Sequence, residues 1–205
     1  MNKNTKDILN AYETIAEKYN EILWNDMPYN TYIDRFMSLL NGKKIIDMGC
    51  AMGSFTKYVK DHGFDIEGID ISPKMIELAK IRDKSIKYQV MDMLNLHLKD
   101  VYDGIMAINS TIHIEKRDME HLFKSFYNIM KDEGVFFIIL QEGEGEKYVD
   151  EPFNPNVKEL VSFYQTDEIE SLFNKIGFKI IGKDKIFDDS EFELGNDQLV
   201  YYLKK

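Results

Sequence analysis

A glycine turn between an apolar strand and a helix constrains the fold of this chain more than any other feature. The twelve residues from Ile45 to Thr56 read IIDMGCAMGSFT. Two apolar residues lead into Asp47, Gly49 and Gly53 bracket a tight turn, and a helical pattern follows. Glycine tolerates both such a turn and the close approach of a ligand, and the first amides of a helix bind polar groups. We therefore expect a polar ligand to meet bare backbone amides at this turn.

The chain after residue 43 alternates short apolar segments with amphipathic ones, which is typical of a parallel sheet with crossover helices. We expect an α/β fold with a Rossmann-like, doubly wound, mostly parallel sheet of seven strands and an antiparallel C-terminal strand. The last two strands should be antiparallel because the acidic connection between them, residues 188–197, is too short for a crossover helix. The expected strands are 44–48, 65–70, 86–91, 102–108, 135–140, 178–187 and 198–203, and the expected helices are 54–61, 73–82, 117–131 and 166–176.

Two amphipathic helices are expected before the first strand, within residues 5–41. Apolar residues between Tyr12 and Leu23 recur at helical spacing, and a second such segment follows Pro28 and ends at Asn41-Gly42. We interpret residues 1–42 as a helical cap and residues 43–205 as the Rossmann-like core of a single domain.

An acidic segment that begins with EGEGE, residues 142–146, is expected to form a flexible loop as far as about residue 156. Its simplest role is that of a solvated lid over the site. The alternative is that Glu142, Glu144 and Glu146 draw a cationic acceptor to the mouth of the pocket.

Charge and cysteine content exclude several classes of partner. The formal net charge of −10 argues against wide contact with a phosphate backbone. No apolar run approaches the ~20 residues of a membrane span. Cys50 is the one cysteine, so an intrachain disulfide or a thiolate metal cluster is not possible. We expect a cytoplasmic monomer or homodimer that uses no metal, no nucleic acid and no membrane.

Polar residues stand at the ends of four successive expected strands: Asp47, Asp70, Asp92 and Asn109. In a doubly wound sheet, ligands bind at the carboxyl ends of the strands, beside the point where the strand order reverses. Asp70 is placed to accept bonds from two ribose hydroxyls, although it could instead cap the next helix, a role that Ser72 also suits. Asp92 stands between two methionines, which suits an adenine amino group and ring. Together these positions predict a nucleoside-like ligand.

Several segments together resemble the class I S-adenosylmethionine-dependent methyltransferases. The matching segments are IIDMGCAMGSFT, GIDISPKMIELAK, YQVMDMLNL, YDGIMAINSTIHI and MKDEGVFFIIL, and AYETIAEKYNEI is similar to the Y-x-x-I-A-x-x-Y-D segment of such enzymes. The match covers residues 8–203, and EGEGE resembles a bacterial subgroup of small members. The resemblance implies that a methyl group passes from S-adenosylmethionine to an O, N or C nucleophile of a small-molecule acceptor.

The resemblance also implies which residues contact the cofactor. Ala51 departs from the family, since many members have a second glycine there, and Met52 replaces a small polar residue. The methionine part would be lined by Asp47, Gly49, Cys50, Ala51 and Gly53, with the Asn109 backbone near its amine and sulfonium and Tyr19 closing over it. The adenosine part would be held by Asp70 at the ribose, Ile71 and Met75 against the adenine, Asp92 at its amino group and Met93 beside the ring.

His113, four residues past the fourth strand end, is the candidate catalytic base. Its alternative role is that of a hydrogen-bonded residue that shapes the pocket. His62, His97 and His121 are expected at the surface, and Cys50 is expected to pack rather than react, since no activating base is visible.

Two other classes of function remain open. A dinucleotide-dependent oxidoreductase is weakened because the turn reads D-x-G-x-x-x-G rather than G-x-G-x-x-G. A non-catalytic S-adenosylmethionine-binding module is the third reading. A nucleic-acid amino-methyltransferase is disfavoured because the fourth strand ends in NSTI rather than in an N-P-P-Y type of motif.

Overall fold

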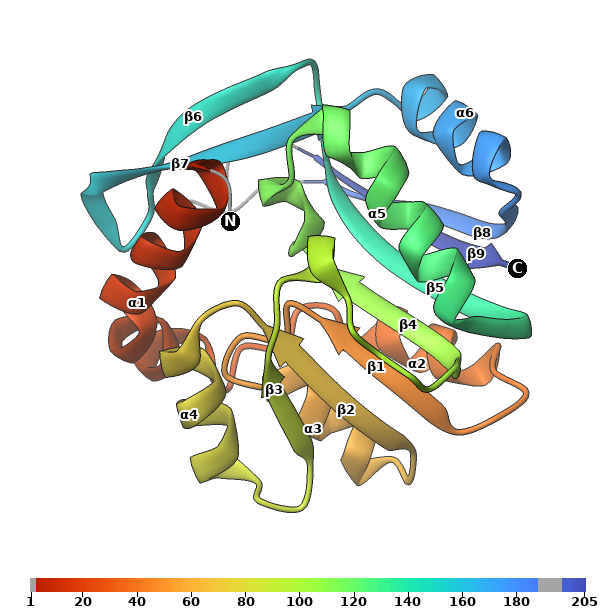
Figure 1. Ribbon diagram of the computed structural model, residues 1–205, viewed down its shortest axis with the longest axis horizontal. Coiled ribbons are helices and arrows are strands. Elements are labelled where there is room, and N and C mark those ends of the chain that lie inside the picture. Colours follow the sequence, from red (N-terminus) through yellow and green to blue (C-terminus); the bar gives the residue numbers. More distant parts are fainter. Residues whose placement is uncertain (1–2, 188–196) are drawn as a thin grey trace.

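A computed structural model of the chain describes residues 3–187 and 197–205. Within them, nine strands form one sheet of order β3-β2-β1-β4-β5-β7-β6, and β9 joins it between β5 and β8 (Figure 1). Neighbouring strands from β3 to β5 are parallel, whereas β9 is antiparallel to both β5 and β8. The predicted mostly parallel α/β sheet with an antiparallel C-terminal strand is confirmed.

All of the expected strands and helices are present, although β5 begins five residues earlier than expected. The expected count of seven strands was wrong, because β6 and β7 bring the described strands to nine. The strands are β1 (Lys44–Met48), β2 (Asp65–Asp70), β3 (Lys87–Val90), β4 (Tyr102–Ile108), β5 (Met130–Glu142), β6 (Glu146–Glu151), β7 (Asn154–Tyr164), β8 (Lys179–Ile186) and β9 (Gln198–Lys204). The helices are α1 (Lys3–Leu23), α2 (Asn30–Ser38), α3 (Ser54–Asp61), α4 (Pro73–Arg82), α5 (Lys116–Ile129) and α6 (Thr166–Ile176), with short 3-10 helices η1 (Met93–Asn95) and η2 (Thr111–His113).

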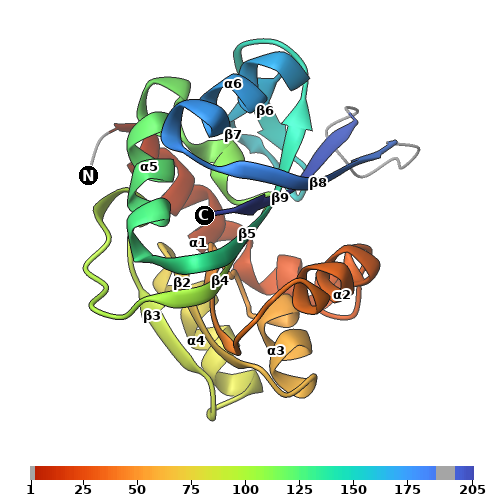
Figure 2. The ribbon, with the colours of Figure 1, turned by 90° about the vertical axis from the view of Figure 1, so that its right-hand side faces the viewer.

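Helices cover both faces of the sheet, as the doubly wound interpretation requires. Phe36 of α2 and Val59 of α3 belong to the core on one face, together with Phe137 of β5. Phe123 of α5 belongs to the core on the other face, together with Phe136 of β5. Successive side chains of a strand point to opposite faces, so β5 contributes to both cores. Figure 2 shows α5 on one side of the sheet and α2 and α3 on the other.

The acidic segment that we expected to be a loop is a β-hairpin, so that expectation was wrong. β6 pairs antiparallel with β7, with Tyr148 opposite Leu160, and the end of β7 continues the main sheet through Phe163 opposite Gln141 of β5. Glutamates and prolines hide the strand pattern in the sequence. The charged residues of β6 are compatible with a strand because β6 is an edge strand, where charge discourages pairing with another chain, and Pro152 lies between the two strands.

Helix α1 lies between this hairpin and α4 (Figure 1). Its docking onto α4 depends on Glu13, whose Oε1 accepts bonds from Ser72 Oγ at 2.5 Å and from the amide of Lys74 at 3.0 Å. Ser72 Oγ in turn accepts from the amide of Met75, so the predicted capping role of Ser72 is confirmed. This arrangement places the inner face of α1 over the carboxyl ends of the strands.

Two remaining expectations concern the membrane and the acidic connection. No helix among residues 3–187 and 197–205 combines the length and apolar character that crossing a membrane requires. Residues 188–196 of the acidic connection lie outside the described residues, but the antiparallel pairing of β8 with β9 that it predicted is present.

Candidate active site

Two neighbouring clefts lie at the carboxyl ends of β1 and β4, where the strand order reverses. The first has a volume of about 120 Å³ and extends toward the ends of β2 and β3, and the second, about 590 Å³, extends below the β6–β7 hairpin. The two clefts are neighbours, because they share lining residues. The shared residues are Tyr12, Tyr19, Gly49, Ala51, Ile108, Asn109 and His113.

The backbone amides of the glycine turn hold the turn against β2. The amides of Gly49 and Cys50 donate to the carbonyl of Ile69 at 2.8 and 2.9 Å. The amide of Ala51 donates to Asp70 Oδ2 at 2.9 Å. Our expectation of bare amides was therefore wrong for these three positions, because the turn must be fixed to the neighbouring strand before it can shape a cleft.

The turn nevertheless needs its glycines. Gly49 has φ +75°, and a Cβ on it would lie 2.4 Å from the Cβ of Ser110. Gly53 has φ +82°, and a Cβ there would lie 2.5 Å from the hydroxyl of Tyr88. Ala51 has φ +46°, a left-handed conformation that costs an L-residue roughly 1–2 kcal/mol. The departure from glycine at this position thus stores strain inside the site.

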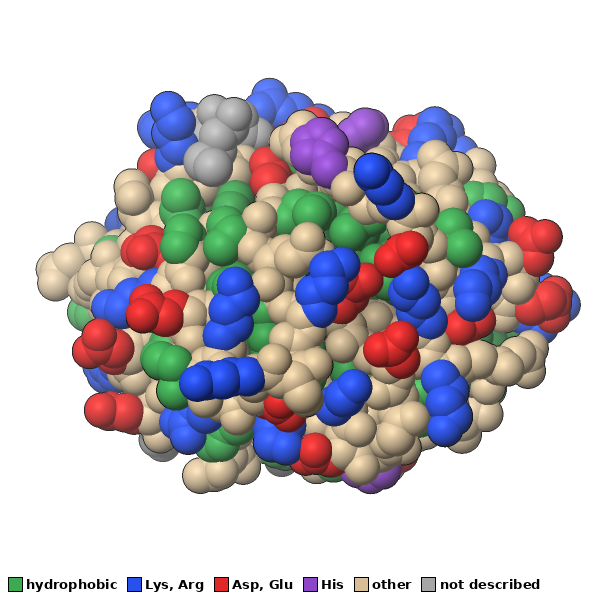
Figure 3. Space-filling model, turned by 60° about the horizontal axis from the view of Figure 1, so that its bottom comes forward, with side chains coloured by type: hydrophobic (Ala, Val, Ile, Leu, Met, Phe, Trp, Pro, Cys, Tyr) green, Lys and Arg blue, Asp and Glu red, His purple; other side chains and the backbone are tan. Residues whose placement is uncertain are grey.

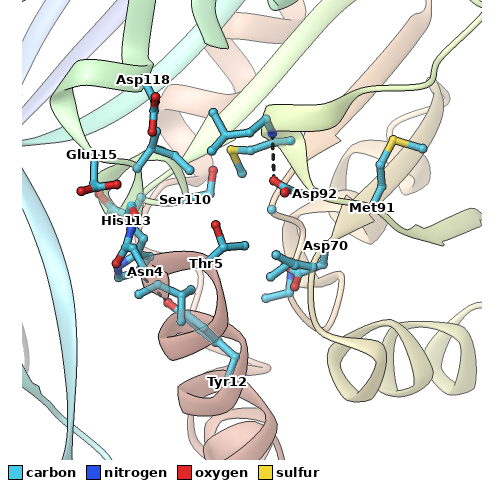
Figure 4. A pocket seen from close by; sticks show the side chains of 18 of the residues that line it. Asn4, Thr5, Tyr12, Asp70, Met91, Asp92, Ser110, His113, Glu115 and Asp118 are labelled. Carbon is cyan, nitrogen blue, oxygen red and sulfur yellow. Dashed lines mark hydrogen bonds between the residues drawn. The ribbon is translucent and has the colours of Figure 1, made fainter. Parts of the chain in front are cut away.

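Asp70 and Asp92 lie on one side of the first cleft, opposite Tyr12 and His113 (Figure 4). Asp70 accepts the amide of Ser72 on Oδ1 at 2.9 Å, besides the turn amide on Oδ2, and burial raises its pKa. Asp92 accepts two bonds from η1, at 3.0 and 2.9 Å. A carboxylate has about four lone-pair positions, so both can still accept hydrogen bonds from a ligand.

Asp47 is a buried carboxylate in the second cleft. Its Oδ2 accepts a hydrogen bond from the hydroxyl of Thr56 at 2.7 Å, and its side chain is otherwise removed from water. Burial raises the pKa of Asp47 to about 7. A ligand cation beside it would favour the charged carboxylate, since an opposite charge lowers a carboxyl pKa.

The other predicted cofactor residues divide between the clefts and the core. Cys50 borders the second cleft, but its thiol packs among Ile76, Ala79 and Tyr88, and burial raises its pKa well above the usual value, which disfavours a thiolate. Met75 is fully buried against Ala16 and lines neither cleft, because α1 covers it. Gly53 also lines neither cleft and packs on Tyr88. Ile71 and Met93 line the first cleft, and Tyr19 and Asn109 line both.

His113 is held from both sides of its ring. Nδ1 lies 2.9 Å from the carbonyl oxygen of Leu160, and Nε2 lies 2.9 Å from the hydroxyl of Tyr12. A carbonyl accepts only, so Nδ1 carries the proton, and in the neutral ring Nε2 accepts from Tyr12. The base position of His113 is therefore covered by Tyr12. His62, His97 and His121 are exposed, as predicted.

Polar residues of the second cleft were missed by sequence reasoning. Glu151, Glu159 and Gln141 are all buried and line this cleft. Glu151 and Glu159 come from the hairpin that was expected to be a loop. The short, mostly apolar run LVSFY, residues 160–164, was the signal that could have found the strand.

The three glutamates that were expected to face the acceptor are engaged elsewhere. Glu142 pairs with Lys185 at 2.5 Å, and Glu144 accepts from the side-chain amide of Gln165 at 2.6 Å. Glu146 accepts from the amide of Lys116 at 2.6 Å. None of the three lines either cleft, so the structure gives them no contact with an acceptor.

The comparisons with known proteins agree with this geometry. The family model described as a methyltransferase domain matches residues 24–183. Phosphoethanolamine N-methyltransferase 1 of Arabidopsis thaliana is 28% identical over 82% of this chain and 33% of its own length. A ubiquinone biosynthesis O-methyltransferase of Coxiella burnetii is 24% identical, over 84% of this chain and 80% of its own.

Solved structures show the same fold. The magnesium protoporphyrin IX methyltransferase of Synechocystis PCC 6803, solved with bound S-adenosylmethionine, has a TM-score of 0.75 at 13% identity and covers 100% of this chain and 99% of its own. The chain spans between a third and just over half of the length of the first curated relatives it matches.

The chain belongs to the methyltransferase domain family, and its resemblance to the class I S-adenosylmethionine-dependent methyltransferases is confirmed. The narrower assignment to an EGEGE subgroup stays a prediction. Within the described part of the chain, no three His, Cys, Asp or Glu side chains group in a way that could hold a metal ion.

Proposed function

We propose that this protein transfers the methyl group of S-adenosylmethionine to a small-molecule acceptor. The observation that carries the proposal is the pair of clefts that meet at Gly49 and Asn109, with nucleoside-type acceptors at one end and a larger chamber at the other. The cofactor would extend across the junction, and the acceptor would enter from below the β6–β7 hairpin.

The residues present fit such a cofactor. Asp70 keeps free lone pairs for ribose hydroxyls, with Asp92, Ile71 and Met93 placed for the adenine. Asp47, whose charged form is disfavoured by burial, is placed to pair with the cation of the methionine part. When bound, S-adenosylmethionine supplies a methyl carbon that is already activated by its positive sulfur.

The remaining work of the protein is positioning. Holding an acceptor atom in line with the reacting bond, about 3–3.5 Å away, supplies much of the acceleration of such a step. Tyr19 and the Asn109 backbone border both clefts and would set that line. A base role for His113 would require proton transfer by way of Tyr12, whose hydroxyl covers Nε2.

Two alternatives are disfavoured by specific features. For a dinucleotide-dependent oxidoreductase, the turn has the wrong glycine spacing and its first amides are already bonded to β2 and Asp70. A non-catalytic binding module would not need an acceptor site, yet the second cleft is lined by buried polar groups that suit one.

A small-molecule acceptor is also favoured by the surface charge. Lys and Arg side chains are interspersed with Asp and Glu over the face shown in Figure 3, and the net charge of −10 opposes binding to nucleic acid. We further propose a cytoplasmic protein, monomeric or homodimeric, in which residues 1–42 cap a core of residues 43–205 within one domain.

The test is a titration followed by a transfer assay. Calorimetric titration of the purified chain with S-adenosylmethionine should give one site, whereas NADH should give no heat of binding. Incubation with labelled S-adenosylmethionine and a metabolite extract should then place label in a small molecule. Binding of NADH in preference to S-adenosylmethionine would refute the proposal, and cofactor binding without label in any acceptor would favour the non-catalytic alternative.

A further inference from the structure

The second cleft is acidic and has one basic side chain among the residues described around it. Asp26, Asp47, Glu151 and Glu159 line it, and His113 is the basic residue. Glu151 and Glu159 come from the two strands of the hairpin and are only 3% and 6% exposed. Burying two carboxylates in one chamber is costly unless cations or hydrogen-bond donors compensate them.

The compensation that the chain itself provides is incomplete. Glu151 Oε2 accepts the amide of Phe153 at 2.8 Å, and the pKa of Glu151 is raised by burial and then by the charge of Glu159. Glu159 Oε2 has no hydrogen-bond partner among the described residues, and His113 Nε2 lies 3.9 Å from it. An oxygen buried in this way, beside a cleft, lacks a donor that a ligand can provide.

A second unpartnered acceptor lines the same chamber. Gln141 is 3% exposed, and its Nε2 donates to Asn109 Oδ1 at 3.4 Å. Its Oε1 has no partner within the part of the chain that the structure describes. Gln141 belongs to β5, not to the hairpin, so the two free acceptors are independent, and both require a ligand that donates hydrogen bonds.

The rest of the wall is aromatic and apolar. Tyr19 lies edge-on to Phe153, with ring centroids 5.6 Å apart, and Tyr29 lies edge-on to Phe55 at 5.7 Å. All four rings border the second cleft. Aromatic faces attract ammonium groups and also bury the apolar body that carries them.

We infer that the second cleft binds a protonated amine on an apolar body, with its N–H groups directed at Glu159 and Gln141, and that this amine is the methyl acceptor. The inference rests on the proposed function and narrows its O, N or C nucleophile to nitrogen. An alcohol or a carboxylate of the same size would leave the charge of Glu159 uncompensated.

The methyl transfer requires one proton acceptor, and Glu159 serves as that acceptor. The bound ammonium gives one N–H proton to the Glu159 carboxylate and becomes a neutral amine. The nitrogen lone pair forms the new N–C bond to the methyl carbon, while the electrons of the C–S bond stay on sulfur. The products are a methylated ammonium and S-adenosylhomocysteine, and Glu159 releases its proton to water.

The test compares three probes of one shape on the whole chain saturated with S-adenosylhomocysteine. Phenethylamine, phenethyl alcohol and phenylacetate are titrated by calorimetry near neutral pH. We expect the amine to bind at least about tenfold more tightly than the alcohol, with the carboxylate weakest, because a buried charge pair is formed. In Glu159→Gln this preference should fall to about twofold or less, with S-adenosylhomocysteine affinity unchanged, which also shows that the variant is folded.

Glu144→Gln is the matched control, since Glu144 is an exposed residue between β5 and β6 that lies outside both clefts, and it should keep the full preference. Equal binding of amine and alcohol, or a preference that survives Glu159→Gln, would overturn the inference alone. A loss of S-adenosylhomocysteine affinity in Glu159→Gln would overturn it by assigning the carboxylate to the cofactor. Failure of the unmutated chain to bind S-adenosylmethionine would overturn the proposed function, and the inference with it.

Discussion

At the scale of single residues, the site depends on a few positions whose backbone or charge is unfavourable by itself. Gly49 and Ala51 have left-handed backbone conformations, and Asp47 is a carboxylate without access to water. Strain and desolvation of this kind cluster at functional sites because the surrounding structure compensates for them. Substitution of such a residue should therefore change the unfolding free energy and the cofactor affinity in ways that can be measured separately.

Gly49→Ala should abolish cofactor binding and destabilise the fold. The added Cβ would meet Ser110 at 2.4 Å in a backbone conformation with φ +75°, so β1 or β4 must shift. Gly63→Ala is the matched control, because Gly63 has φ +85° but no atom among the described residues within 4 Å of the added Cβ. We expect Gly63→Ala to cost about 1 kcal/mol of unfolding free energy, and Gly49→Ala at least about 2 kcal/mol more. Urea denaturation and calorimetry check both, and equal costs would contradict the steric explanation.

Asp47→Asn should stabilise the empty protein at high pH while weakening its cofactor binding. The folded state holds the Asp47 proton with a pKa of about 7, above the unfolded value of 3.8. The stabilisation from this group is therefore complete below the unfolded pKa and is lost as the pH rises through about 7. The unfolding free energy of Asp47→Asn, relative to that of the unmutated chain, should therefore increase by about 2–3 kcal/mol between about pH 5 and pH 8.

Chemical denaturation at several pH values measures this trend. Asp61→Asn, at an exposed carboxylate that pairs with Lys57, is the control and should show no such widening. A pH-independent gain for Asp47→Asn would mean that the buried carboxyl is not raised in pKa.

At the scale of elements, α1 and the β6–β7 hairpin complete a site that the sheet begins. The sheet brings Gly49, Asp70 and Asn109 to one edge, and α1 adds Tyr12 and Tyr19 above them. The hairpin adds the acidic wall of the second cleft. The sheet edge, α1 and the hairpin therefore contribute different walls of the two clefts.

Glu13→Ala should loosen α1 and weaken cofactor binding about five- to tenfold. Glu13 joins α1 to α4 through two hydrogen bonds, and a hydrogen bond to a charged group is worth roughly 1.5–3 kcal/mol. Glu17→Ala is the control, because Glu17 is 76% exposed and its ion pair with Lys74 at 3.2 Å is a surface pair. Calorimetric titration with S-adenosylmethionine should detect the first change and almost none in the control. Equal effects of the two variants would show that Glu13 does not hold the helix.

At the scale of the whole molecule, the two cores of the sheet and the capping helix make cofactor binding and global stability interdependent. The clefts are lined by strand ends, by α1 and by the hairpin, so a bound ligand joins elements that are far apart in the sequence. A ligand that binds only the folded state stabilises that state by mass action.

S-adenosylmethionine at about one hundred times its Kd should therefore raise the melting temperature by about 5–10 °C. The binding term is about 2.7 kcal/mol, and each kcal/mol shifts the melting temperature of a chain of this size by roughly 2–4 °C. Scanning calorimetry measures the shift, and NADH and Gly49→Ala serve as negative controls. The same shift with NADH would contradict the cofactor assignment.

The mostly parallel sheet and the polar residues at its strand ends could be predicted from the sequence, because both depend on local patterns. Apolar runs separated by amphipathic ones require a parallel sheet, and the residue at the end of a strand is readable from the strand itself, as for Asp70 and Asp92. The burial of Met75 in the core, the bonds of the turn amides to β2 and the contact of Tyr12 with His113 could not be predicted in this way. The same is true of the wall of the second cleft, since Glu159 reaches the cleft only when β7 pairs with strands that lie elsewhere in the chain. Such contacts leave no periodic trace in the sequence, because they depend on which distant segments pack together.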